Sequence, residues 1–232
     1  MNIVTQFDLL SPLDLAALAL LLICIFGLDR LVEHSPARFR SVSYVMRGYR
    51  AEWMRHMVTR QPRIFDSAIL GTLRQGTTFF ASSSIIAIGG ALALMSNPQT
   101  LNDLAGDLTK SQAPAVLWEI KMLLIVLLLI SAFLRFVWAH RLFGYAAVLM
   151  AAVPNDPEDP LAFPRAAKAG DLSSLAGRSF NRGMRSVYFS LGATGWLIGA
   201  APLMLTTLAI TAMILRREFG SNTRVVLMRP ED

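Results

Sequence analysis

The apolar residues of this chain gather in long, uninterrupted stretches. A membrane-spanning helix needs about 20 mostly apolar residues, and four segments meet that requirement. They lie at about 9–31, 77–96, 116–138 and 188–215. The pattern predicts an all-α polytopic membrane protein in which four transmembrane helices form a bundle, with residues 1–232 as a single membrane domain.

The first span is expected to be retained. A cleaved signal peptide begins with a basic region, but no Lys or Arg precedes Arg30, and Asp8 and Asp14 stand there instead. We therefore interpret 9–31 as the first helix of the bundle.

The connections 32–76 and 139–186 also carry helical patterns. Between residues 41 and 62, apolar positions recur at steps of three and four, the repeat of one helical face. They are Val42, Val45, Met46, Tyr49, Trp53 and Met57. A further helix from Pro62 to Ser96 would be about 52 Å long at 1.5 Å per residue. That exceeds a bilayer core of about 30 Å, so helices should protrude from the membrane.

The third span is expected to protrude in the same way. After Trp138 the sequence has no helix breaker until Pro154, and the prolines from 154 to 164 mark a loop. Asp171 would then cap a helix that enters the fourth span.

The composition excludes most soluble classes of protein. Hydrophobic residues make up 54% and charged residues 16% of the chain, whereas soluble domains have about 45–50% and about 25%. The single cysteine, Cys24, excludes a disulfide scaffold and a cysteine-cluster metal site.

Basic residues predict the orientation. The connection 30–76 holds nine Arg against three acidic residues, and 139–186 holds six basic against four acidic residues. Because basic loops stay in the cytoplasm, both connections are expected inside a bacterial inner membrane and both termini outside. Four arginines after residue 215 conflict with that assignment. The net charge of +6 is thus a topology signal, and no nucleic acid is expected as a partner.

The basic amphipathic segment 41–62 has two interpretations. Arg47, Arg50, Trp53 and Arg55 are candidates for contact with anionic lipid headgroups, with the aromatic rings at the membrane surface. Alternatively, the same face packs against the protruding helices. Membrane lipids are therefore one predicted partner.

Charges near the ends of the spans are the candidate functional groups, because intramembrane charges are often functional. These candidates are Asp14, Asp29, Glu119, Lys121, Arg135 and His140. Spans one and three run in the same direction, so Asp14 is level with Glu119 and Lys121, and Asp29 is level with Arg135. The groups either line a proton or anion path or form structural pairs at the membrane edges.

Small residues in spans two and four predict close helix packing. The candidates are Gly89, Gly90, Gly192, Gly195 and Gly199. Gly195 and Gly199 have the GxxxG spacing that lets helix backbones approach closely, and Pro202 is expected to kink the fourth span. The pattern leaves open whether the contacts are within one chain or between chains.

The sequence has no recognised motif for metal or cofactor chemistry. The three histidines lack HxxxH or HxxE spacing, and the sequence has no Walker loop, GxGxxG or GxSxG motif. We expect no cofactor, no metal and no enzymatic activity.

Several motifs together resemble a known family. They are Arg55 to Arg63 with Asp66, the run Phe79–Gly90, the run Arg178–Gly183, Tyr188–Phe189, Gly195–Trp196 and Pro202. They are similar to an uncharacterised four-span integral membrane protein family of unknown function, found in bacteria and plants. The resemblance implies four membrane helices and supplies no catalytic residues.

The expected function is that of a non-catalytic structural or accessory membrane protein, which self-associates or binds a larger membrane complex. The alternative is a small transporter or channel with a charged path near Asp14, Asp29, Glu119 and Arg135.

Overall fold

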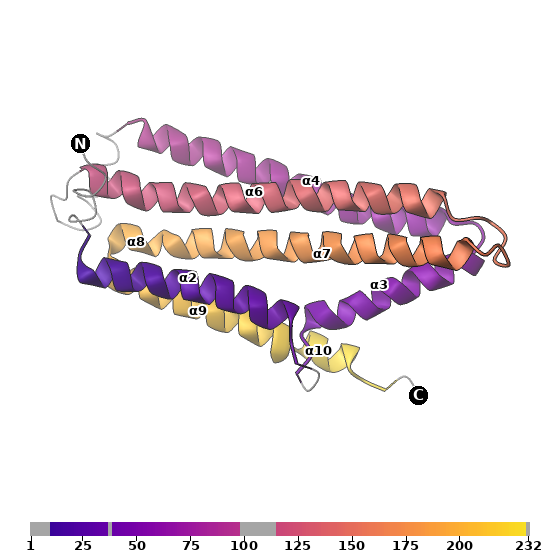
Figure 1. Cartoon of the computed structure of the whole chain (residues 1–232). Helices are drawn as coiled ribbons and strands as arrows, with labels where there is room; N and C mark the ends of the chain where they lie inside the picture. Colours follow the sequence, from indigo (N-terminus) through magenta and orange to yellow (C-terminus); the bar gives the residue numbers. More distant parts are fainter. Residues whose placement is uncertain (1–9, 37–38, 98–114, 231–232) are drawn as a thin grey trace.

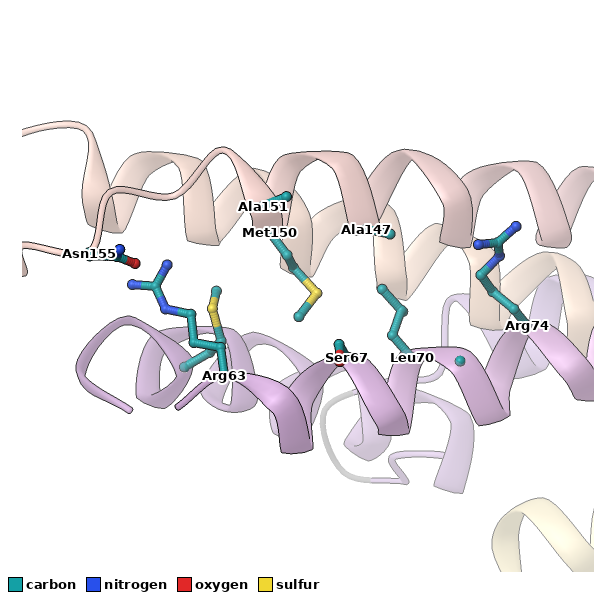
Figure 2. A pocket seen from close by; sticks show the side chains of 10 residues that line it. Arg63, Ser67, Leu70, Arg74, Ala147, Met150, Ala151 and Asn155 are labelled. Atoms are coloured by element: carbon teal, nitrogen blue, oxygen red, sulfur yellow. The ribbon is translucent and has the colours of Figure 1, made fainter. Parts of the chain in front are cut away.

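The fold is a bundle of long helices (Figure 1). The computed structural model describes residues 10–36, 39–97 and 115–230, and every regular element in these ranges is a helix. The helices are α2 (Pro12–Glu33), α3 (Val42–Thr59), α4 (Ile64–Met95), α6 (Ala115–Ala151), α7 (Ala162–Ala193), α8 (Gly195–Ile198), α9 (Ala200–Phe219) and α10 (Asn222–Leu227). The predicted all-helical fold is confirmed.

Within the described ranges, four helical segments are long and apolar enough to cross a membrane: α2, α4, α6 from Val116, and α9 continued through α10. The amphipathic helix α7 runs along the middle of the bundle between α6 and α2 (Figure 1). It lies antiparallel to α6 and presents small buried residues to its neighbours, among them Ala169, Ser173 and Ala176. Small side chains let the neighbouring helices approach closely on several sides.

Helices α4 and α6 extend well beyond the thickness of a bilayer core. With 32 and 37 residues, they are about 48 and 55 Å long, against a core of about 30 Å. The predicted long helix after Pro62 is therefore confirmed as α4. Near the loop that joins α6 to α7, helices α4 and α6 pack with α3 and α7 around Met54, Met57, Phe143 and Met150. We call this part of the bundle the α3 end, and the opposite part the α8 end.

The predicted fourth span, 188–215, is a helical hairpin in the structure. Helix α7 ends at Ala193, α8 forms a short turn, Gly199 is extended, and α9 returns along the bundle (Figure 1). A proline in a helix interior lacks a backbone donor and clashes with the preceding turn. Because α9 begins at Ala200, Pro202 stands in its first turn, where proline is tolerated. Instead of the kink expected at Pro202, the chain reverses its direction at Gly199.

This hairpin changes where the chain ends. Helix α2 starts at the α8 end, where Trp196 donates to Asp14, and α9 runs from there toward the α3 end and finishes beside the start of α3, where Arg224 of α10 donates to the Arg40 carbonyl. The two helices therefore run parallel (Figure 1). The predicted orientation counted 188–215 as one crossing, whereas this segment reverses its direction at Gly199.

The helix expected to start at Asp171 begins earlier. Helix α7 starts at Ala162, and Asp171 lies inside it with its side chain exposed. Pro164 falls in the first turn of α7, where it needs no backbone donor, so the proline-rich loop ends sooner than the prolines suggested.

The close contact between α8 and α9 gives a first test. A Cβ at Gly195 would lie 2.8 Å from Thr206 Oγ1 and 3.0 Å from the Pro202 carbonyl oxygen. Gly195→Ala should therefore destabilise the hairpin by about 1–3 kcal/mol through overpacking. The midpoint of thermal unfolding in detergent measures the effect. In the matched control Gly90→Ala, the added Cβ has no atom within 4 Å, and equal midpoints for both variants would contradict the described turn.

Candidate functional site

Two carboxylates of α2 face three arginines of α7 inside the bundle. Arg185 Nε lies 2.7 Å from Asp29 Oδ1, and Arg185 Nη2 lies 3.2 Å from Glu33 Oε1. Arg182 Nε reaches Asp29 Oδ2 at 2.9 Å, and Arg178 Nε reaches Glu33 Oε2 at 2.7 Å. Spacings of three and four residues place the groups on one face of each helix, so the two helices present complementary charge ladders.

The ladder is buried at its centre. Asp29 is 6% exposed and Arg185 is 5% exposed. Taking such charges out of water is costly unless they are paired and hydrogen-bonded. Asp29 meets this condition with both oxygens bonded, and Arg185 bridges both carboxylates. The arrangement therefore holds α2 and α7 in one register.

Neighbouring residues of α7 hold α6. Ser179 Oγ donates to the Arg135 carbonyl at 2.9 Å, while Arg135 Nη1 donates to the Arg182 carbonyl at 3.1 Å. A Cβ at Gly183 would lie 2.7 Å from the Phe136 ring, so glycine permits this approach. Helix α6 is thus fixed to α7 by polar contacts and by close packing at the same level.

Phe180 extends the contact to α4. Its ring centroid is 5.6 Å from that of Phe80 and 5.5 Å from that of Phe136. Phe80 and Phe136 stack at 5.5 Å. Aromatic pairs at such distances add about 0.5–1.5 kcal/mol beyond the burial of their area.

Asn181 connects α7 to α3 and α9. Its Nδ2 donates to Ser43 Oγ at 3.1 Å, and Ser43 Oγ donates to Glu218 Oε1 at 2.8 Å. The Ser43 amide also donates to Glu218 Oε2 at 3.0 Å. A carboxylate at the first turn of α3 is favoured by the helix dipole. We refer to residues 178–185 and their partners as the hub.

The predicted pairing of Asp29 with Arg135 lies at the edge of the hub. Arg135 Nη1 is 3.7 Å from Asp29 Oδ2, farther than the arginines of α7. The sequence analysis assigned no partners to Arg182 and Arg185. Their spacing of four and three residues from Arg178 onward places all three arginines on one helical face, and this pattern could have predicted that they share carboxylate partners.

The charges at the α8 end lie apart from the hub. Asp14 caps α2 together with Ser11 and accepts from Trp196 Nε1 at 2.7 Å. Lys121 Nζ lies 4.8 Å from the Trp118 ring centroid, and Glu119 is exposed. The expected grouping is therefore formed in part: Asp14 and Lys121 attract each other and each also contacts a tryptophan. Glu119 has no polar partner among the described residues.

His140 lies between α6 and α4. Its Nε2 is 3.3 Å from Arg74 Nη2, and its Nδ1 is 3.2 Å from the hydroxyls of Thr77 and Thr78. Since arginine only donates, a neutral His140 accepts at Nε2 and donates from Nδ1. The imidazole is fully occupied in joining the two helices.

Three of the four predicted lipid-contacting residues pack against protein. Trp53 Nε1 donates to the buried Asp66 at 2.7 Å, and Arg47 Nη2 donates to the Glu33 carbonyl at 3.0 Å. The Arg50 guanidinium occupies the space that a side chain at Gly177 would fill, and burial lowers the pKa of Arg50. Arg55 is exposed. The packing interpretation of this segment fits these contacts.

The predicted packing glycines divide into two groups. A Cβ at Gly192 would lie 2.5 Å from Ile210 of α9, closer than the 2.8 Å at Gly195. Gly199 is the junction before α9. Gly89 and Gly90 have no atom of the described chain within 4 Å of an added Cβ, so they face outward from α4.

The hub predicts a large loss of stability when one carboxylate is neutralised. Asp29→Asn leaves Arg185 with only Glu33 as a carboxylate partner and removes the counterion of Arg182, so the loss should be about 3 kcal/mol, the lower end of the range for breaking a buried ion pair. The midpoint of thermal unfolding in detergent measures it. Asp171→Asn removes an exposed carboxylate of α7 and should shift stability by less than about 0.5 kcal/mol.

A double-mutant cycle with Arg185→Gln separates the pair from its surroundings. The double variant should lose less than the sum of the two single losses, because each single variant already removes the contact between Asp29 and Arg185. Strict additivity would show that the two side chains do not interact.

Comparison with known proteins identifies the family of this chain. No curated protein matches the chain, and no solved structure matches it. A match to one protein family covers residues 16–223 and includes every element of the hub. The chain belongs to the family described as "Protein of unknown function, DUF599".

Proposed function

We propose that this protein is a non-catalytic accessory protein of the bacterial inner membrane, which self-associates or binds a larger membrane complex. The observation that carries the proposal is the hub. Its charged groups are occupied in holding α2, α3, α6 and α9 around α7. Such a bundle offers a rigid scaffold in the membrane.

A transport path would need the charges to be connected along the bundle. Asp14 and Asp29 are 15 positions apart on one helix, about 22 Å along its axis. Between their levels lie buried apolar side chains, including Leu21 and Phe189. The charges thus lie in separate layers, which favours pairing over conduction.

The outer face of α4 is the surface we propose for association. Among the long helices it packs chiefly against α6, and its apolar section is little buried (Figure 1). Gly89 and Gly90 lie on it with open space around them, beside the 74% exposed Ile86. Small residues on an exposed membrane helix permit a second helix to approach closely.

The proposed orientation follows the chain path. With α2 and α9 parallel, both helices end on the side toward the α3 end, and the described arginines of the connection 30–76 and those after residue 215 belong to segments on that side (Figure 1). Basic segments remain in the cytoplasm, so we place the α3 end and the C-terminus inside and the N-terminus outside.

A C-terminal reporter tests the orientation. A fused green fluorescent protein should fluoresce because it folds in the cytoplasm, and a fused alkaline phosphatase should be inactive there. A dark green fluorescent protein fusion together with an active alkaline phosphatase fusion would show that the C-terminus lies outside the cytoplasm.

Association is tested by mild extraction into nanodiscs, affinity capture and mass spectrometry, with the mass of the assembly measured in parallel. We expect a homo-oligomer or stable partner subunits, and the paired change Gly89→Leu with Gly90→Leu should reduce the assembly. Ala19→Leu, on the exposed face of α2, is the control. A monomer recovered alone would contradict the accessory role.

A further inference from the structure

A groove at the end of α9 is lined by apolar residues and by two arginines. Its volume is about 540 Å³, and it runs from Ala209, Ala212 and Met213 to Arg216, Arg217 and Ser221. None of the described residues lining it is acidic. We propose that this groove binds one anionic phospholipid of the cytoplasmic leaflet, with the lipid phosphate at the arginines and an acyl chain along the alanines.

The charges of the groove are available to a ligand. Glu218, the acidic residue next in sequence, is bonded to Ser43 of α3. Arg217 donates to the uncharged Tyr188 hydroxyl at 3.0 Å, and the Ser221 hydroxyl accepts from the Arg224 amide, which leaves its hydrogen free. Cations without a protein counterion beside hydroxyl donors suit a phosphate group.

The order of residues along α9 matches the order of groups in a lipid. Ala209 and Ala212 precede the arginines and lie in the apolar part of the helix, whereas Gly220 and Ser221 follow where the helix ends. Leu205 and Leu208, nearby on α9, are 67% and 50% exposed and would extend the hydrocarbon contact. A lipid in the leaflet at the α3 end would enter the groove with its head at Arg216.

Basic residues at the cytoplasmic surface attract anionic lipids. The inference rests on the proposed orientation, because only that places the arginines at the level of the inner headgroups. It does not depend on self-association, since the groove lies on α9 and the proposed association surface lies on α4.

The test is native mass spectrometry of the purified full chain, titrated with dioleoyl phosphatidylglycerol and with dioleoyl phosphatidylcholine. We expect one phosphatidylglycerol to bind more tightly than phosphatidylcholine. Arg216→Gln with Arg217→Gln should weaken that step by about five-fold for each arginine, the factor equivalent to about 1 kcal/mol per basic residue. Ala212→Trp should weaken it with both charges intact, because Trp fills the apolar part of the groove.

The matched control is Arg30→Gln with Arg141→Gln, which removes two exposed arginines from α2 and α6. An equal loss in this control would reduce the effect to general charge attraction and overturn the site. Unchanged binding in Ala212→Trp would overturn the acyl-chain groove. Arg216→Gln alone is the second variant if the double change alters the unfolding midpoint, since the Arg216 side chain has no polar partner in the described part of the chain. Assembly mass and reporter topology, measured on the same variants, distinguish failure of this site from failure of the proposed function.

Discussion

The structure depends on the pairing of the buried carboxylates of α2 with the guanidinium groups of α7. A buried unpaired charge costs several kcal/mol, so α7 can occupy the middle of the bundle only where its arginines meet partners. Asp29 and Glu33 supply them at one level along the helix. This requirement fixes the rotation of α7, and with it which neighbours Phe180 and Asn181 reach.

The remainder of α7 shows why an amphipathic helix can lie inside a largely apolar bundle. Toward the α3 end its small side chains admit α3, with the Arg50 guanidinium over Gly177. Toward the α8 end it becomes uncharged, and Gly192 admits α9. Different parts of α7 therefore contact different neighbouring helices, through ion pairs, through aromatic rings or through close backbone packing.

Sequence patterns predicted the long apolar helices well, because runs of uncharged residues and periods of three and four are local signals. The bounds of α4 and the helical nature of α3 followed from them. The turn at Gly199 did not, since an uncharged stretch from Ser186 to Leu215 reads equally as one helix or two. Asp29 was identified as a candidate, but its partner Arg185 is 156 residues away in sequence. Only the packing of α7 against α2 brings them together.

That separation has a consequence for biosynthesis. Helix α2 is made first and carries its two carboxylates into the assembling protein, while the arginines that neutralise them emerge only after most of the chain has been synthesised. Long-range contacts of this kind form late. Until α7 arrives, Asp29 and Glu33 must remain at the water boundary, so the final depth of α2 is set when the last third of the polypeptide joins it.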